Sequence, residues 1–543
     1  MVPRPLFLAL LLCSAGSCRA PSGYRADADK EVYQILDEVR ARLSDDVFRI
    51  DPPVNDLRSR ILAGEEAAED ALPPLSLVQV LEIAAENSRE FQSQREALFL
   101  AALDLTRERW EFSVKDVGVL GAFLSDPGAA DSTAGGDGAL TLTRLFETGA
   151  RVMGSIGFDL ARDISSADGW SAFTNLSLNI TQPILRGFGR DIVREPLTQS
   201  ERDVLYQART FERFRRTFAF DATSRYFRVL EQMDTVKNEE LNLENLGQLR
   251  ERNEAFAEAG LLSDIQVDQA RQDELRSKDN LVAARRQLEE RLDGLKLFLG
   301  LPIETKIELD QAELETLERF DSPEISALSE DEAADLALRE RLDHAVIMDR
   351  IDDSERRVKV FADALRTGLD LSADVGARSD ANQPFAFGSD GLTWDARLDL
   401  DLPIDRLPER NAYRAGLIAR DAAVRDGEAS SDGVRADVRD ARRTLDAARQ
   451  SHSIQSGAVV LAERRVESAA LNLEAGRAST RDLLEGQEAL VQAQNAATRA
   501  QIDQLLAELA LYRDLELLRV GPDGLSVDIS RIGAESPSGE ENP

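Results

Sequence analysis

The chain has 543 residues, with 66 Lys or Arg against 100 Asp or Glu, so its formal net charge is −34. This acidity disfavours broad electrostatic binding of nucleic acid, because phosphate contacts need basic side chains. Apolar residues make up 43% of the chain and aromatic residues only 6%. Such a composition excludes wholesale disorder and favours long helices.

The residue types that most often carry catalysis or metal binding are scarce. The only two cysteines, Cys13 and Cys18, lie at the N-terminus, and the two histidines, His344 and His452, are isolated from one another. Metal sites need clustered ligands, and the sequence contains no Gly-rich phosphate loop or catalytic set of side chains. We therefore predict no enzyme activity, no metal and no cofactor. After the N-terminus there is also no apolar run long enough for a transmembrane helix.

The first residues read as an export signal. Arg4 precedes the apolar run Leu6–Leu12, and small residues follow up to Ser17. Residues 1–17 are therefore predicted to be a signal peptide, with Cys18 as the acylated first residue of a lipoprotein. An ordinary secretory signal cut nearby is the alternative. Residues 18–74 form an N-terminal extension with helical patterning around Val32, Ile35, Leu36 and Val39.

Two halves of the chain repeat the same order of elements. The first repeat, 75–302, predicts a helix over 75–112, strands to Thr181, a long helix over 196–259 and a helix to Leu299. The second repeat, 329–520, predicts a helix over 330–366, strands to Leu402, a long helix over 408–475 and a helix to Val520. Residues 303–328 form a linker with a short strand near 306–309, and 521–543 form an acidic disordered tail.

The glycine-containing helix turns give the best internal match. Glu258-Ala259-Gly260 corresponds to Glu474-Ala475-Gly476 at an offset of 216 residues, and Pro183 corresponds to Pro403 at an offset of 220. The unit is therefore duplicated. In the helix after the first turn, the leucines at 281, 288, 292, 295 and 299 are spaced for lateral coiled-coil packing, which also fits a soluble helical bundle.

Strict alternation of apolar and polar residues in four segments of about ten residues favours a membrane protein over a soluble helical bundle. Apolar residues alternate with polar ones over 150–160, 175–181, 369–377 and 392–402, the length and pattern of strands that cross a bilayer around water. A soluble sheet covered on one face is the alternative. The strands place acidic side chains on the water-facing lumen side at Asp159, Asp370, Asp374, Asp395, Asp399 and Asp401. The segments 117–124 and 139–146 also look strand-like, and their role stays open.

Four strands cannot close a barrel, and an open sheet edge in hydrocarbon leaves backbone groups unpaired. The sequence therefore predicts that several copies share one barrel. The strand–helix junctions are Gln182-Pro183 and Pro403, where proline cannot extend the ladder through an N–H of its own. A simple strand terminator is the plainer interpretation of both prolines.

With the duplicated helix–hairpin–helix–helix order, the Gln182-Pro183-Ile184-Leu185 junction and the two glycine turns, the chain resembles the TolC-like outer-membrane efflux protein family over about 75–520. The resemblance implies a mainly α fold with long antiparallel coiled-coil helices and four β-strands per protomer. It also implies a homotrimer with a twelve-stranded membrane β-barrel and an α-helical periplasmic tunnel. The expected partners are outer-membrane lipid, a periplasmic adaptor (membrane fusion protein) and an inner-membrane pump.

The resemblance also assigns roles to the helix turns. The turns Gly260-Leu261-Leu262 and Gly476-Arg477-Ala478 would meet the tips of the adaptor, although glycine at these places is also explained by chain reversal alone. Asp482 and Glu485 hold the places of acidic residues that narrow the family's periplasmic aperture. A solvated helix face is an equal alternative for these two residues.

The function that the resemblance implies is a passive outer-membrane channel in a tripartite efflux or type I secretion system of a Gram-negative-type bacterium. A periplasmic coiled-coil adaptor or scaffold is the alternative. An adaptor is expected to carry one helical hairpin within a compact β-rich domain, whereas this sequence predicts two long hairpins. The sequence identifies neither the transported substrate nor the class of pump.

Overall fold

The structure is a computed structural model that describes residues 19–40, 48–50, 58, 61, 74–125, 133–163, 170–314, 325, 327–380, 382–402, 404–475, 477–521 and 524–532. By their contacts the residues form two units. The first unit comprises residues 1–48, 97–208 and 346–428, and the second comprises 49–96, 209–345 and 429–543. Each predicted repeat thus contributes segments to both units.

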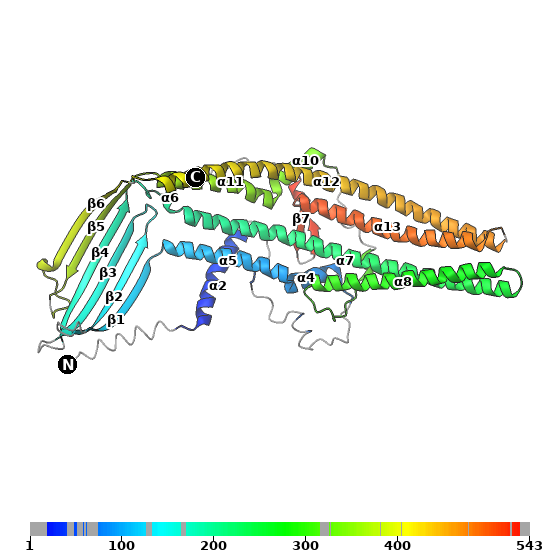
Figure 1. Cartoon of the computed structure of the whole chain (residues 1–543), viewed down its shortest axis with the longest axis horizontal. Coiled ribbons are helices and arrows are strands. Elements are labelled where there is room, and N and C mark those ends of the chain that lie inside the picture. The colour runs from blue at the N-terminus through cyan, green and yellow to red at the C-terminus, as the bar shows by residue number, and fades with distance from the viewer. Residues whose placement is uncertain are drawn as a thin grey trace. The chain divides into compact units, whose positions relative to one another are not determined.

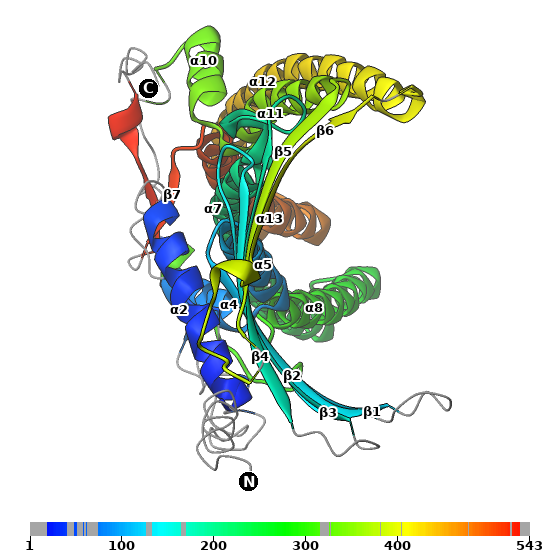
Figure 2. The ribbon, with the colours of Figure 1, turned by 90° about the vertical axis from the view of Figure 1, so that its left-hand side faces the viewer.

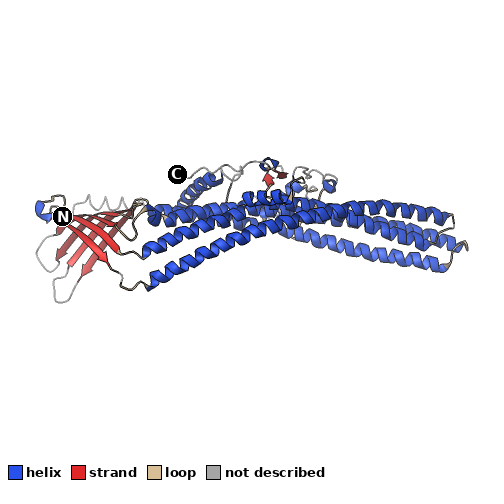
Figure 3. Cartoon of the chain, turned by 90° about the horizontal axis from the view of Figure 1, so that it is seen from above, coloured by secondary structure: helices blue, strands red, loops and turns tan. Residues whose placement is uncertain are grey.

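Most described residues outside the sheet are helical, as Figure 3 shows. The helices are α2 (Pro21–Arg40), α4 (Leu77–Asn87), α5 (Arg89–Glu111), α6 (Arg190–Val193), α7 (Glu195–Glu258), α8 (Asp264–Phe298), α10 (Glu330–Glu340), α11 (Leu342–Ala364), α12 (Leu407–Glu474) and α13 (Thr480–Asp514). None of these described helices has a stretch long and apolar enough to cross a membrane. In α2, Val32, Ile35 and Leu36 are buried, as the patterning of the N-terminal extension predicts.

Helix lengths recur in the same order in the two predicted repeats. Helices α4 and α10 each have 11 residues, α5 and α11 each have 23, and α8 and α13 each have 35. Ser76 and Ser329 close matching capping boxes at the starts of α4 and α10. The single helices predicted over 75–112 and 330–366 are each interrupted once, because Ser88 and Arg341 adopt extended backbone conformations.

The first unit contains an antiparallel sheet whose six described strands follow chain order (Figure 1). They are β1 (Lys115–Ser125), β2 (Thr133–Leu145), β3 (Arg151–Asp163), β4 (Ser171–Pro183), β5 (Gly368–Arg378) and β6 (Leu392–Asp401). The four predicted strands are therefore present as β3 to β6. The two segments whose role was open are also strands, so this sheet exceeds the expected four. Seen from one end, the strands lie along a curved arc (Figure 2).

The second unit is built on two helical hairpins, formed by α8 with the end of α7 and by α13 with the end of α12. Leu246 and Leu249 of α7 pack with Leu483 and Leu484 of α13. Farther along, Val236 packs with Leu281 and Ala284 of α8. The predicted leucine seam is thus partly a core contact between helices, with Leu281, Leu295 and Leu299 all buried.

A short hairpin, β7 (Leu518–Gly521) with β8 (Gly524–Val527), follows α13 in the second unit. The sequence predicts helix up to Val520, but α13 ends at Asp514 because Glu516 takes a positive φ of 61°. The Glu516 side chain is fully buried, and Arg213 and Arg216 of α7 both donate hydrogen bonds to it. Burial raises the pKa of Glu516 despite these two guanidinium groups.

Some sequence predictions fall outside the described residues. These are Cys18 with the signal peptide, Pro403, Gly476, and residues 533–543 of the tail. The disordered tail is predicted over 521–543, but residues 524–527 of it form strand β8, because they pair with β7. The linker contributes an isolated parallel bridge between Leu309 and Leu75, at the place where a short strand is predicted.

Candidate functional site

The sheet of the first unit has one apolar and one polar face. On the apolar face, apolar residues lie directly opposite one another on neighbouring strands. Leu178 lies opposite Val375, and Leu371 lies opposite Leu398. The exposed large apolar side chains on this face are Leu120, Leu124, Leu140, Leu142, Ile156, Leu176, Leu178, Ile180, Leu371, Val375, Leu392, Trp394, Leu398 and Leu400. An apolar surface this continuous on a soluble protein would be an interaction site, and strands of 10 to 13 residues match the span of a bilayer.

The polar face carries all six of the acidic residues predicted to face water. Two pairs lie directly opposite one another, Asp370 with Asp399 and Asp374 with Asp395. Asn179 donates a hydrogen bond of 2.5 Å to Asp374, and Asn175 donates one of 2.8 Å to Asp159. Asp137 of β2 is a further acid on this face, directly opposite Asp159. Sequence reasoning missed Asp137 because it lies within a glycine-rich run that resembles a loop.

Aromatic side chains gather at both ends of the strands. All three tryptophans of the chain lie at or in the sheet: Trp110 precedes β1, Trp170 precedes β4, and Trp394 lies in β6. Phe146 and Phe188 follow β2 and β4 at the end nearer the long helices, and Phe385 and Phe387 lie in the opposite loop between β5 and β6. All of these side chains are at least 39% exposed. Aromatic girdles at the two ends of strands are typical of membrane barrels.

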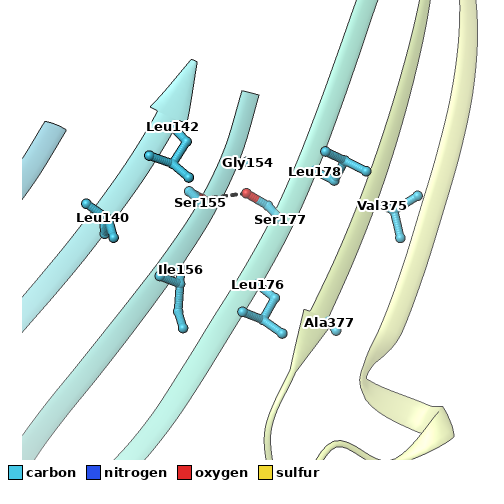
Figure 4. Close-up of a pocket in the computed structure, with 10 residues that line it drawn as sticks. All are labelled: Leu140, Leu142, Gly154, Ser155, Ile156, Leu176, Ser177, Leu178, Val375 and Ala377. Carbon is cyan, nitrogen blue, oxygen red and sulfur yellow. Dashed lines mark hydrogen bonds between the residues drawn. The ribbon is translucent and has the colours of Figure 1, made fainter. Parts of the chain in front are cut away.

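A shallow recess interrupts the apolar face at Gly154 (Figure 4). Its volume is about 340 Å³, and Leu140, Ile156, Leu176 and Val375 surround it. The recess exists because Gly154 has no side chain and no atom lies within 4 Å of the place where a Cβ would be. On the opposite face the Ser155 and Ser177 hydroxyls lie 2.6 Å apart and tie β3 to β4.

The first strand–helix junction is more tightly built than a simple strand end. Gln182 donates a hydrogen bond to the carbonyl of Thr148, and the N–H of Ile184 after Pro183 still donates to Leu369. A Cβ on Gly149 would lie 2.7 Å from the Gly187 carbonyl, and Gly149 has a φ of +90°. Pro183 therefore ends β4 without ending its hydrogen bonding to β5.

A polar network in the first unit joins the start of α7 to α11. Asp353, which is 3% exposed, accepts hydrogen bonds from Arg202 (2.6 Å), Tyr206 (2.8 Å) and Arg356 (2.9 Å). Burial alone would raise the pKa of Asp353, but the hydrogen bonds from Tyr206 and Arg202 outweigh it and lower that pKa. Burial and the neighbouring Asp353 carboxylate raise the pKa of Tyr206. No local sequence pattern predicts this network, because Arg202 and Tyr206 lie about 150 residues from Asp353 along the chain.

The first helix tip, in the second unit, ends in a Schellman turn at Gly260. The Leu261 N–H donates to the Phe256 carbonyl and the Gly260 N–H donates to the Ala257 carbonyl, with a φ of +76° at Gly260. The Leu261 side chain is 74% exposed, and Ile265 is 69% exposed. Leu262 is half-buried beside them. The tip thus presents apolar side chains to solvent.

The second helix tip shares one of these hydrogen bonds, because the Arg477 N–H bonds to Asn472 as the Leu261 N–H bonds to Phe256. The N–H groups of Arg477 and Ala478 both donate to the Asn472 carbonyl. Asp482 accepts hydrogen bonds from the Ser479 N–H (2.8 Å) and hydroxyl (2.7 Å), and these bonds lower the pKa of Asp482. Glu485 accepts a 2.9 Å hydrogen bond from Arg481. Asp482 therefore has a helix-capping role whether or not it borders an aperture.

No cluster of three or more metal-binding side chains occurs among the described residues. Comparison with protein families found that residues 334–515 match the family described as "Outer membrane efflux protein". This match lies within the second repeat and covers about a third of the chain. The chain is an outer-membrane efflux channel, and the matched family is one of transport proteins rather than enzymes.

Solved structures share the fold of this chain. It is similar to CusC with 14% identity and a TM-score of 0.60 over 87% of this chain and 99% of CusC. The CmeC outer membrane channel of Campylobacter jejuni gives 14% identity and a TM-score of 0.60 over 88% and 91%. The outer membrane protein VceC of Vibrio cholerae gives 15% identity and a TM-score of 0.59 over 81% and 95%. No curated protein matched the chain.

Proposed function

We propose that three copies of this efflux channel enclose one pore, through which solutes pass from a periplasmic adaptor and an inner-membrane pump to the exterior. The two-faced sheet carries this proposal. Its apolar face suits lipid, its polar face suits a water-filled lumen, and a single open sheet would leave edge N–H and C=O groups unpaired in hydrocarbon. The pore itself supplies no energy, so transport follows the pump.

The two helix tips are the proposed adaptor contacts. The supporting observation is the exposure of Leu261 and Ile265 at the first tip, because exposed apolar side chains at a chain reversal suit contact with another protein. Arg477 and Ala478 occupy the equivalent turn at the second tip. We further propose that Asp482 and Glu485 of each copy border the periplasmic aperture, where their charges would attract cations.

Cys18 is the proposed lipid anchor, supported by the small residues before it and by the start of α2 three residues later. Incorporation of a labelled fatty acid into the wild-type chain, and its loss in Cys18→Ala, is the expected result. Labelling that persists in Cys18→Ala would rule this anchor out.

The channel proposal is tested by purifying the full chain from outer membranes in mild detergent. Native mass spectrometry is expected to give three copies, and planar bilayers are expected to show discrete, long-lived conductance steps. As a matched pair, Leu261→Asp is expected to abolish cross-linking to the adaptor while leaving conductance intact, and Glu251→Gln on the exposed side of α7 is expected to change neither. A monomer without conductance would contradict the proposal.

A further inference from the structure

The sheet has two open edges, and we propose that they pair with each other between copies. In this arrangement β1 of one copy forms an antiparallel ladder with β6 of the next. The barrel wall then contains six strands from each copy, which gives eighteen strands rather than twelve in a trimer. The number eighteen rests on the proposed three-copy channel, whereas the β1–β6 seam does not depend on the copy number.

The open edges are the outermost strands of the sheet. Within the described residues β1 pairs only with β2, and β6 pairs only with β5. Each unpaired backbone group in hydrocarbon costs several kcal/mol, so both edges need a partner. Strand β1 leads away from helix α5 and β6 returns toward α12, so copies related by rotation about the pore axis bring the two edges together antiparallel.

The β1–β2 hairpin has a defined strand register, as expected of a part of the barrel wall rather than of a loosely attached loop. Two of its glycines, Gly135 and Gly138, lie where the opposite strand carries a large side chain. The ring of Phe123 covers Gly135, where an added Cβ would lie 2.6 Å from Phe123 Cζ. Leu120 covers Gly138 in the same way, at 3.0 Å. Aromatic side chains over glycines are a device that fixes strand register.

The registers within the sheet show how far successive strands are staggered. Starting at Gly118 in β1, the directly opposed residues are Leu140, Ile156, Leu176, Ala377 and finally Leu392. This line begins near the helix end of β1 and finishes at the far end of β6. The sheet is therefore skewed as tilted strands in a barrel wall are, and its strands follow an arc (Figure 2).

Full overlap of the 10-residue β6 with the 11-residue β1 allows two registers, and only one of them keeps the apolar face continuous. That register places Leu392 of one copy opposite Leu124 of the next, and Asp401 opposite Lys115. In this register the apolar side chains Leu398 and Trp394 face the same side as Gly118 and Ala122, so the apolar face continues across the seam. A shift by one residue would turn every β6 side chain to the wrong face.

This register closes a barrel with ordinary geometry. The line that starts at Gly118 returns to the next copy at Leu124, six residues farther along β1. For every six strands around the barrel, the line of directly opposed residues is thus displaced by six residues along the strand direction. With a rise of about 3.3 Å per residue and strands about 4.8 Å apart, that stagger gives a tilt of about 35°. Outer-membrane barrels have tilts of about 35–45°.

Cysteine cross-linking tests the seam, because the chain has no cysteine after Cys18. Val119→Cys/Arg397→Cys and Gly118→Cys/Leu398→Cys place directly opposed thiols on the two edges. Neighbouring antiparallel pairs alternate between two spacings, so the two double variants sample both. Ser155→Cys/Arg397→Cys is the matched control. If the wall began at β3, with four strands per copy and Asp401 opposite Arg151 at the helix end, Arg397 would face Ser155.

Oxidation of at least one edge pair in membranes is expected to give covalent dimers and trimers, with the trimer as the largest species. The single variants and the Ser155→Cys/Arg397→Cys control are expected to stay uncrosslinked. Trimers from the control pair and none from the edge pairs would overturn the seam. Cross-linked species no larger than a dimer would contradict three copies per barrel, and with them the number of eighteen strands.

Native mass spectrometry and conductance of the same preparations separate this inference from the channel proposal. Conducting trimers that fail to cross-link at either edge pair would refute the β1–β6 seam alone. A chain that is neither oligomeric nor conducting would refute the channel proposal itself. Circular dichroism and resistance to detergent denaturation check that each variant is folded before its cross-linking is scored.

Discussion

Asp353 shows how one buried carboxylate can hold two helices in place. Its partners Arg202, Tyr206 and Arg356 lie on α7 and α11, in the same unit as the sheet. We predict that Asp353→Asn lowers the free energy of unfolding by about 3 kcal/mol, because it removes a buried charge and leaves two guanidinium groups poorly paired. Denaturant unfolding of the detergent-solubilised protein measures the change.

The neighbouring Asp352 provides the control for this prediction. It is largely exposed and lies 3.7 Å from Arg202, so Asp352→Asn is expected to change stability little.

The pH dependence of stability adds a second test of the role of Asp353. The pKa of Asp353 is lowered on folding, so its stabilisation is present above the unfolded pKa of about 4 and is lost as pH falls through the lower folded value. The difference between wild type and Asp353→Asn should therefore shrink below about pH 4, and a difference that is constant from pH 7 to pH 2 would contradict this assignment.

Asp482 combines a helix-capping role with the proposed place at the aperture, and the two can be separated. We predict that Asp482→Asn with Glu485→Gln weakens block of the channel by divalent cations, because it removes two carboxylates per copy. Ser479→Ala removes the capping hydroxyl but leaves both charges, so block should persist in that variant. Single-channel recording with added Ca²⁺ measures both, and unchanged block in the double variant would remove these residues from the aperture.

At the scale of elements, Gly260, which follows the end of α7, carries a constraint that Gly247 within α7 does not. Its φ of +76° suits glycine, and Gly260→Ala is predicted to cost about 1 kcal/mol. Gly247, in the interior of the same helix, has no atom within 4 Å of an added Cβ, so Gly247→Ala should stabilise by up to about 1 kcal/mol. Denaturant midpoints that move in opposite directions are expected. A Gly260→Ala variant as stable as the wild type would show that the turn tolerates a side chain.

The same elements show what could be predicted from sequence. Strict alternation over 369–377 and 392–402 identified β5 and β6 and the face of each residue, because a half-buried strand has a period of two. Strand β1 lacks that signal. Val117, Val119 and Phe123 lie on the face where the other strands are polar, while Leu120 and Leu124 lie on the apolar face, so the segment reads as apolar throughout.

The breaks within helices and the hydrogen-bond network of Asp353 were harder to predict. The breaks at Ser88 and Arg341 leave the helical periodicity almost intact on both sides, so the sequence predicts one helix where the structure has two. The contacts of Asp353 join residues that the chain separates by about 150 positions, and pairings at that distance leave no local pattern. The duplication was visible because Gly260 and its counterpart share their neighbours in sequence.

At the scale of the whole molecule, a net charge of −34 is spread over solvated helices as well as the sheet, so the total alone does not determine ion selectivity. The polar face of the sheet is the place where acidity should matter. Asp370 and Asp399 lie directly opposite one another there, and a concentrated negative charge lining a pore favours cations.

We predict that Asp370→Asn with Asp399→Asn makes the channel less selective for cations, so that its reversal potential in a KCl gradient moves toward zero. The same change removes a repulsion between directly opposed like charges, so the stability of the sheet should not fall. Asp421→Asn on α12, whose side chain pairs with Arg420 at 2.7 Å, is the control and should leave the reversal potential unchanged. If the double variant also keeps the wild-type reversal potential, the polar face of the sheet does not set selectivity, and the charges that do must lie along the helices.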